Sequence, residues 1–176
     1  MTSSRPYRVL MVCMGNICRS PTAEAVLRHK ARERGLDHVV DVDSAGTHAY
    51  HVGHPPDPRS REAALNRGIE LTGQARRVAA TDFSEFDLIL AMDNANYENL
   101  LAEAPPGQGD RVKKMMAYSN LGVTDEVPDP YYGGRHGFEQ VLDLLDNAVA
   151  GLLDELTPVL SGGKGEQGSG GEGEGA

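Results

Sequence analysis

Apolar residues gather in short runs along the chain. The two clearest runs cover residues 7–12 and 86–92, and their length and aliphatic content predict buried β-strands. Weaker runs at residues 38–43 and 111–115 predict two further strands. The pattern therefore predicts one small sheet of four strands.

Helical patterns separate these strands. Helix formers or apolar residues at helical spacing predict helices over residues 20–34, 57–67, 93–103 and 137–156. Strands that alternate with helices predict an α/β fold, in which a mostly parallel sheet has helices on both faces. Ligands of such sheets bind at the carboxyl ends of the strands.

The length and the C-terminal composition predict one domain and a tail. A chain of 176 residues can bury one sizeable core but not two. We expect residues 1–160 to form this domain, with long polar loops at residues 44–60 and 118–135 that are candidates for function. Residues 161–176 are rich in glycine and glutamate and have little to bury, so they predict a disordered tail.

The segment that joins the first strand to the first helix suits phosphate binding. Ser20 is a good N-cap and Pro21 suits the first helical position, so a tight loop runs into a helix N-terminus. Unpaired N–H groups and partial positive charge at such a terminus attract anions. The guanidinium of Arg19 adds donors that can grip two phosphate oxygens at once. The segment therefore predicts an anion cradle.

Cys13 ends the strand that leads into this cradle. A helix N-terminus and a cationic neighbour favour the thiolate form of cysteine, so we expect Cys13 to be a nucleophile at neutral pH. Gly15 and Asn16 tolerate the positive φ that converging amides require. The hydroxyl of Ser20 can donate to the sulfur during attack and departure. The alternative is a cysteine that merely packs at the strand end.

Composition and charge narrow the class of partners. The formal net charge of -9 disfavours a nucleic-acid partner, because such binding depends on Lys and Arg. No apolar run reaches the length of a membrane span, and the N-terminus lacks the apolar region of a secretory signal, so we expect no membrane partner. The two cysteines, Cys13 and Cys18, form no disulfide framework, which favours a reducing cytoplasm.

The run VCMGNICRSPTAEAV resembles the low-molecular-weight protein tyrosine phosphatases over its whole length. A bare Cys-x5-Arg pattern, here Cys13 and Arg19, is common by chance, whereas the longer match is specific. The resemblance implies an enzyme without metal or cofactor that hydrolyses phosphotyrosine in proteins, and small aryl phosphates, through a phosphocysteine intermediate. It implies a phosphate-binding loop that consists of Met14, Gly15, Asn16, Ile17, Cys18, Arg19 and Ser20.

Hydrolysis of phosphotyrosine also requires a proton for the departing phenolate, and a positioned acid contributes about 10²–10⁴ in rate. Asp129 matches the Asp of the family's DPY motif, which acts as this general acid and then as the base toward water. Pro130 keeps the preceding residue out of the helical region, so we expect Asp129 on an extended loop over the cradle. An Asp before Pro is otherwise usually a turn residue.

Aromatic residues are expected to wall the cleft. Tyr131 and Tyr132 match family residues that enclose a flat phenyl ring, and Tyr50 is expected on the opposite rim. Ile17 favours an aromatic leaving group, because relatives that act on phosphoarginine carry Thr at that position. The resemblance thus implies that tyrosine-phosphorylated proteins are the partners, and we expect a monomer or weak dimer.

Polar residues are expected to support the loop. The resemblance places Asn16 and Ser44 in a hydrogen-bond network that braces it, together with Ser20. Some relatives complete this network with a His, where this chain has Gly73. Two aspartates at predicted helix starts, Asp57 and Asp93, are candidates to pair with arginines near the loop.

Two sets of residues allow more than one interpretation. Cys18 either fills space below the loop or forms a reversible disulfide with Cys13 that protects the nucleophile. His48, His51 and His54 recur every three residues, which could suggest a metal. Glycines and prolines interrupt this spacing and no carboxylate–histidine motif accompanies it, so we expect no metal site.

Two other functions compete with phosphatase activity. Arsenate reduction on the same fold needs cysteines downstream to relay a disulfide, and none follows Cys18. A non-catalytic phosphopeptide-binding or redox-sensing module would need neither a nucleophile nor an acid, whereas this chain offers both. A phosphatase is therefore the favoured hypothesis.

Overall fold

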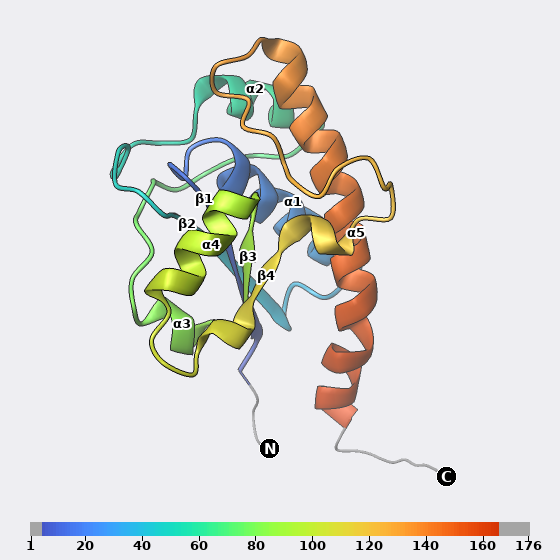
Figure 1. The fold of residues 1–176 in the computed structure, drawn as a ribbon. Coiled ribbons are helices and arrows are strands. Elements are labelled where there is room, and N and C mark those ends of the chain that lie inside the picture. The colour runs from blue at the N-terminus through green and yellow to red at the C-terminus, as the bar shows by residue number, and fades with distance from the viewer. Residues whose placement is uncertain (1–4, 166–176) are drawn as a thin grey trace.

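The computed structural model describes residues 5–165, which fold around one parallel sheet (Figure 1). The strands lie side by side in the order β2-β1-β3-β4, and all three pairings are parallel. The strands are β1 (Tyr7–Cys13), β2 (Val40–Gly46), β3 (Leu88–Ala91) and β4 (Val112–Lys114). This confirms the predicted four-stranded α/β fold, and the carboxyl ends of all four strands therefore lie at one edge.

Helices cover both faces of the sheet. They are α1 (Arg19–Glu33), α2 (Pro58–Leu65), α3 (Asp82–Glu85), α4 (Asn94–Glu103) and α5 (Arg135–Gly165), with short 3-10 turns at Gly109–Arg111 and Met115–Tyr118. Along β1, Met11 faces the larger core with α1 and α5, whereas Leu10 and Val12 face the smaller core with α3 and α4. Because both faces are covered, β1 is apolar throughout its buried length, as parallel strands usually are.

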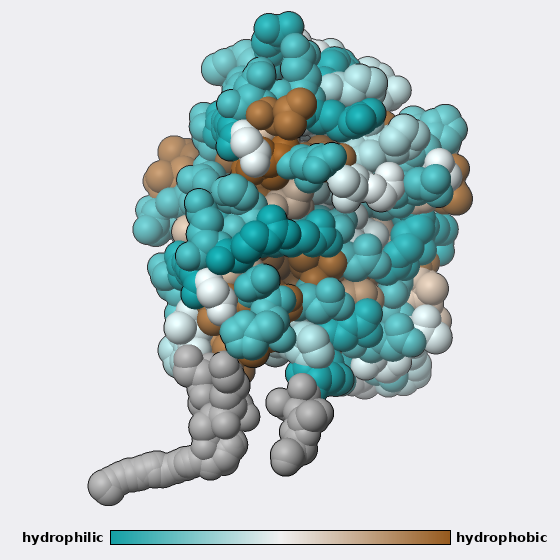
Figure 2. All heavy atoms as spheres, turned by 180° about the vertical axis from the view of Figure 1, so that it is seen from behind, coloured by the Kyte–Doolittle hydropathy of each residue, from teal (hydrophilic) through white to brown (hydrophobic). Residues whose placement is uncertain are grey.

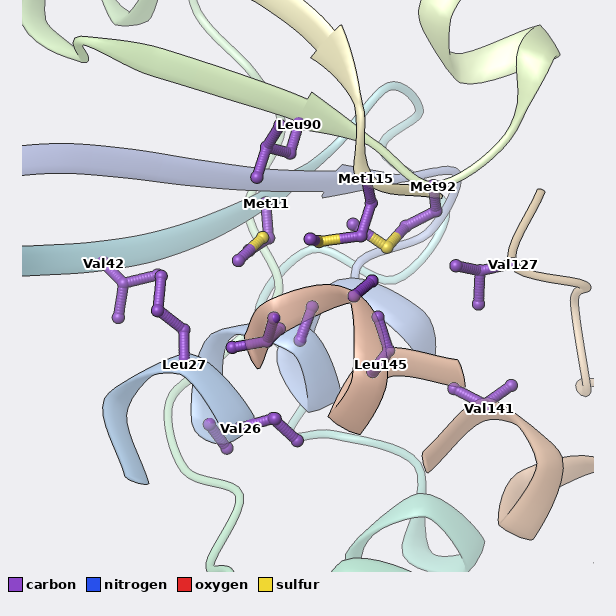
Figure 3. Close-up of a cluster of buried hydrophobic side chains, with 14 of the residues drawn as sticks. Met11, Val26, Leu27, Val42, Leu90, Met92, Met115, Val127, Val141 and Leu145 are labelled. Atoms are coloured by element: carbon purple, nitrogen blue, oxygen red, sulfur yellow. The ribbon is translucent and has the colours of Figure 1, made fainter. Parts of the chain in front are cut away.

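Methionines fill the centre of the larger core. Figure 3 shows Met11, Met92 and Met115 in the layer between the sheet and the helices, with Leu145 of α5 opposite them. All four side chains are buried. The chain has no Trp and few aromatic residues, so flexible thioethers and branched aliphatic side chains supply the packing instead.

The end of β2 lies further along the chain than the apolar pattern predicts. The strand continues through Ser44 and Ala45 to Gly46, which pairs with Cys13. These three residues have low strand propensity, so the sequence gives no sign of them, but pairing with buried β1 determines their conformation. As a result, Ser44 and Gly46 lie near the carboxyl end of β2, at the same edge of the sheet as Cys13.

Two other segments differ from prediction. The helix α3 lies where the sequence shows only turn signals, because four residues are too few for a periodic pattern. The last helix continues to Gly165, so the first five residues of the predicted tail, 161–165, extend α5. Adding residues to an existing helix costs much less than starting one, which explains this extension. Residues 166–176 lie outside the described residues, and disorder there stays a prediction.

The outer surface is largely hydrophilic. Figure 2 shows a mostly polar face with small hydrophobic areas between the polar side chains. Within residues 5–165, no helix combines the length and the apolar content needed to cross a bilayer. Large hydrophobic residues that are exposed include Met14, Tyr50 and Tyr132.

Candidate active site

Cys13 lies at the carboxyl end of β1 with its sulfur surrounded by donors. The residue is only 2% exposed. The backbone N–H groups of Asn16 and Ser20 donate to Sγ over 3.3 Å and 3.4 Å, and the hydroxyl oxygen of Ser20 lies 3.0 Å from it. These three donors are placed to stabilise negative charge on the sulfur.

Ser20 has a different structural role from the one that its sequence position suggests. The helix α1 begins at Arg19, with Cys18 at its N-cap and no side-chain cap hydrogen bond. The prediction that Ser20 is the N-cap is therefore wrong. Because Ser20 lies inside the first turn, its hydroxyl is available to the sulfur of Cys13.

The side chain of Asn16 sets the direction of a buried hydrogen-bond chain. Its Oδ1 accepts from the backbone N–H of Arg76 over 2.9 Å, so its Nδ2 must be the group that donates to the hydroxyls of Ser20 and Ser44, over 2.8 Å and 3.0 Å. Ser44 in turn donates to Glu24 over 2.6 Å. Because Nδ2 occupies one lone pair of Ser20, the hydroxyl proton of Ser20 has two acceptors within reach, the sulfur of Cys13 at 3.0 Å and the carbonyl oxygen of Ala45 at 3.4 Å.

The backbone of the loop after β1 curls around the sulfur. The expected positive φ in this loop is found at Asn16, with a φ of 59°, and not at Gly15, which could also have adopted it. Gly15 is needed for space instead, because a Cβ there would lie 2.9 Å from Cδ2 of His51. Within the described part of the chain, the N–H groups of Gly15, Ile17 and Cys18 donate to no protein acceptor. These donors are available to an anion above the sulfur.

Gly46 provides the space in which this loop turns. A Cβ on Gly46 would lie 2.7 Å from the carbonyl oxygen of Met14 and 3.2 Å from the nitrogen of Asn16. Both neighbours are backbone atoms of the loop after β1, so they cannot swing away as a side chain could. The approach of β2 to the loop therefore depends on a glycine at this position.

We expect Gly46→Ala to lower kcat/KM for an aryl phosphate by roughly 10²-fold, since small misplacements of catalytic groups have effects of that size. The overpacking should also lower the free energy of unfolding by about 1–3 kcal/mol. Steady-state kinetics and urea unfolding measure the two effects. Gly109→Ala is the control, because its Cβ would lie 3.4 Å from the nearest atom, in ordinary contact. Equal activity of the two variants would contradict this account of Gly46.

Arg19 is buried beside the sulfur and is held from below. Its side chain is 2% exposed, and Nη1 donates to Asp93 over 2.6 Å and to the carbonyl oxygen of Val127 over 3.0 Å. Burial alone would lower the pKa of Arg19. The sulfur of Cys13 and the carboxylates of Asp93 and Asp129 outweigh burial, so the pKa of the guanidinium is raised and it stays charged.

Asp93 is therefore one of the predicted arginine partners, and it has two roles. One oxygen accepts from the N–H of Asn96 over 2.7 Å and caps α4, while the other holds Arg19. The second candidate, Asp57, caps α2 and pairs with Arg59 over 2.9 Å. Each cap thus also fixes an arginine near the loop.

Asp129 lies over this floor on the loop that precedes α5. Its Oδ2 is 3.6 Å from Nη2 of Arg19, and its Oδ1 accepts from the N–H of Tyr131 over 3.0 Å. The loop is anchored two residues earlier, where Val127 is fully buried and donates its N–H to the carbonyl of Met92 over 2.7 Å. Figure 3 shows Val127 at the edge of the larger core. This anchor brings Asp129 to the pocket.

The predicted cleft residues line one cavity of about 120 Å³ together with the sulfur. Its lining includes Cys13, Ile17, Arg19, Tyr50, Asp129, Tyr131 and Tyr132. Tyr131 is partly buried against the larger core, whereas Tyr132 is 92% exposed and Tyr50 is 70% exposed. The cavity therefore has a buried, charged floor and an aromatic mouth.

Cys18 also lines this cavity, but its chemistry differs from that of Cys13. Burial, aided by the charge of Asp57, raises the pKa of the Cys18 thiol to about 12. Cys18 is therefore protonated at neutral pH and a poor nucleophile. Both thiols are free in the structure, and a regulatory disulfide between them stays a prediction.

The three histidines contact rings at the mouth of the cavity. His48 stacks on Tyr50 with 5.2 Å between ring centroids, and His51 lies 6.1 Å from His54 and 5.9 Å from Tyr131. Among residues 5–165, no group of three or more His, Cys, Asp or Glu side chains is arranged to hold a metal ion.

Several supporting residues were missed by reasoning from sequence. Glu24 and the N–H of Arg76 complete the chain on Asn16, Gly46 gives the loop space, His51 lines the cavity and the carbonyl of Val127 holds Arg19. Gly46 could have been found from the sequence, because a glycine that closely follows a predicted strand often allows a close approach of the backbone. Backbone donors and acceptors such as those of Arg76 and Val127 have no signal in residue identity.

Comparisons with known proteins point to one family. A family model described as low molecular weight phosphotyrosine protein phosphatase matches residues 8–159. A Schizosaccharomyces pombe protein, named as a low molecular weight phosphotyrosine protein phosphatase, is 46% identical over 154 residues, which cover 85% of this chain and 99% of that protein.

Solved structures give the same result. A protein tyrosine phosphatase from Entamoeba histolytica, with Hepes in its active site, is 42% identical and superposes with a TM-score of 0.85 over 86% of this chain and 97% of that one. A Drosophila arginine phosphatase is 32% identical, with a TM-score of 0.77 over 84% of this chain and 96% of that one. From the family model, the relatives and the shared fold, the chain belongs to the low molecular weight phosphotyrosine protein phosphatase family.

Proposed function

We propose that this enzyme removes phosphate from tyrosine residues of proteins, with Cys13 as nucleophile, Arg19 as phosphate clamp and Asp129 as general acid and base. One observation carries the proposal. The donor-surrounded sulfur of Cys13, the charged guanidinium of Arg19 and the carboxyl group of Asp129 all line a single cavity.

The first step transfers the phosphoryl group to the enzyme. The thiolate of Cys13 attacks phosphorus, and the bond from phosphorus to the phenolic oxygen breaks. The loop N–H groups and Arg19 hold the other phosphate oxygens, whose charge they stabilise. Protonated Asp129 gives its proton to the departing oxygen, so the product leaves as a neutral phenol.

The second step releases phosphate. The carboxylate of Asp129 takes a proton from water, which attacks the phosphorus of phosphocysteine, and the bond to sulfur breaks. The hydroxyl of Ser20, oriented by Asn16, donates to the sulfur as negative charge returns to it. No metal or cofactor has a step in this sequence, because the residues present supply the nucleophile, the acid and the charge stabilisation.

The shape of the cavity supports an aromatic substrate. Its floor holds a nearly inaccessible sulfur, and its mouth is formed by Tyr50, Tyr131 and Tyr132. A phenyl ring can pack against these tyrosines while its phosphate points toward the sulfur. Ile17 adds an apolar wall, consistent with phosphotyrosine in place of phosphoarginine.

The substrate proposal is tested with three peptides that differ only in the phosphorylated residue: phosphotyrosine, phosphoserine or phosphoarginine. We expect kcat/KM for phosphoserine to be lower by roughly 10²-fold or more, because the short side chain forfeits the wall contacts and misplaces phosphorus. EDTA should leave the phosphotyrosine rate unchanged. Similar rates on all three peptides would contradict the assigned substrate class.

The cellular location is a proposal as well. We propose a cytoplasmic location, which is supported by a nucleophile that must stay reduced and by two free thiols.

The assay with the three phosphopeptides also distinguishes a phosphatase from an arsenate reductase. An arsenate reductase would release little phosphate from the peptides, and it would consume thiol reductant when arsenate is added.

A further inference from the structure

Arg59, in the first turn of α2, lies between two aromatic rings from other elements. Its guanidinium carbon is 5.3 Å from the ring centroid of Tyr131 and 4.7 Å from that of Phe138. Both distances are within the range of cation–π attraction. Tyr131 belongs to the loop that carries Asp129, and Phe138 belongs to the first turns of α5. Arg59 therefore bridges α2, the Asp129 loop and α5.

The other side of this bridge is fixed to the phosphate-binding loop. Nε and Nη2 of Arg59 donate to the two carboxylate oxygens of Asp57 over 3.1 Å and 2.9 Å. The backbone N–H of Asp57 donates to the carbonyl oxygen of Ile17 over 2.8 Å. Burial alone would raise the pKa of Asp57, but the hydrogen bonds from Arg59 lower it, so the pair stays ionised.

The Asp129 loop has room to move away from this position. A cavity of about 240 Å³ lies next to Arg59, lined by Ala63 of α2, Gly133 and Gly134 of the loop, and Phe138 of α5. Figure 1 shows the loop running beside α2 before it enters α5. Because Gly133 and Gly134 border this open space, few packing contacts hold this part of the loop in place.

The position of Tyr131 bears directly on Asp129. The backbone N–H of Tyr131 donates to Oδ1 of Asp129 over 3.0 Å, which turns the other oxygen toward Arg19. A shift of Tyr131 would therefore turn the carboxyl group out of the cavity. Contacts that hold the ring of Tyr131 also hold the acid.

We propose that Arg59 is a positioning residue that connects the phosphate-binding loop to the Asp129 loop, through Asp57 on one side and Tyr131 on the other. This inference rests on the proposed acid role of Asp129. It assigns no contact with substrate to Arg59. The expected consequence of losing Arg59 is a loop that holds Asp129 over the cradle for a smaller fraction of the time.

The test compares Arg59→Met with Arg61→Met, a matched change on the same helix at an exposed arginine for which no ion pair is found within residues 5–165. Two substrates are used, one with a poor leaving group such as phenyl phosphate and one with a good leaving group such as 4-nitrophenyl phosphate. We expect Arg59→Met to lower kcat/KM by about three- to tenfold more on phenyl phosphate, as two cation–π contacts of a partly exposed arginine allow. Arg61→Met should leave the ratio unchanged.

The ratio of the two substrates is measured in one preparation, so it is insensitive to a loss of folded enzyme. Arg59→Lys keeps the charge beside Asp57 but loses the planar group, and it should give an intermediate ratio. In an Asp129→Asn background, Arg59→Met should have no further effect on the ratio, because the acid through which it acts is gone.

The results separate the two proposals. If Asp129→Asn alone leaves the ratio unchanged, the acid role is wrong and the inference falls with it. If Asp129→Asn changes the ratio but Arg59→Met does not, or if Arg59→Met changes it equally with and without Asp129, the positioning role is overturned and the acid role stands.

Discussion

Cys13→Ser should release phosphate from an aryl phosphate at least about 10⁴-fold more slowly than the wild type, because a serine hydroxyl in this position has no base to activate it. The surrounding N–H groups, at 3.3 Å and 3.4 Å from Sγ, are placed to stabilise negative charge on a sulfur. A smaller, neutral oxygen would lie further from phosphorus and would keep its proton. Initial rates with saturating substrate measure the effect.

The same variant should still bind oxyanions. Arg19 is held by Asp93 and Val127, and the N–H groups of Gly15, Ile17 and Cys18 make no hydrogen bond to the sulfur within the described residues, so these donors should keep their positions. Calorimetric titration with inorganic phosphate would therefore show binding within about tenfold of the wild type, the scale of one lost contact.

Cys18→Ser is the matched control for the nucleophile. With its pKa raised to about 12, Cys18 is not charged at neutral pH, so its replacement should retain most of the activity. Turnover by Cys13→Ser close to the wild-type rate would refute the proposed nucleophile. Equal inactivity of both serine variants would show that the loop, and not one sulfur, had been lost.

The sequence predicted the part of the site that is local in the chain. Cys13 and Arg19 are six positions apart, between a strand and a helix whose patterns are both clear, so their shared location follows from local structure. The N-cap was assigned incorrectly because Ser20 has two possible uses. Propensity favours a hydroxyl at the cap, whereas the structure uses this hydroxyl for the sulfur.

The site residues that are far apart in the chain could not be brought together from the local sequence pattern alone. Asp129 is 116 positions beyond Cys13, and only its resemblance to the DPY motif indicated that the two meet. The support of Asn16 depends on Glu24 and on the backbone N–H of Arg76, from α1 and from a segment without regular structure. The second of these contacts involves no side chain of Arg76. Residue identity could not reveal it, because any residue except proline offers the same donor.

Asp129→Asn should lower kcat/KM for phenyl phosphate by roughly 10²–10³-fold, which is within the usual contribution of a general acid. The amide keeps the size of the side chain and can still accept from the N–H of Tyr131, so the loop should keep its shape. What is lost is the proton for the departing oxygen. A leaving group that is stable as an anion, such as 4-nitrophenolate, needs no proton, so its kcat/KM should fall much less.

A matched change in the same loop completes the experiment. Asp125 is an exposed aspartate whose Oδ2 lies 3.4 Å from Nζ of Lys114, away from the cavity lining. Asp125→Asn should leave both substrates within about twofold of the wild type, as expected for an exposed ion pair. Because both variants remove one carboxylate from one loop, general loss of charge cannot explain a difference between them. Equal losses by Asp129→Asn on both substrates would mean that the carboxyl group of Asp129 acts on the phosphoryl group or on folding, and not on the leaving oxygen.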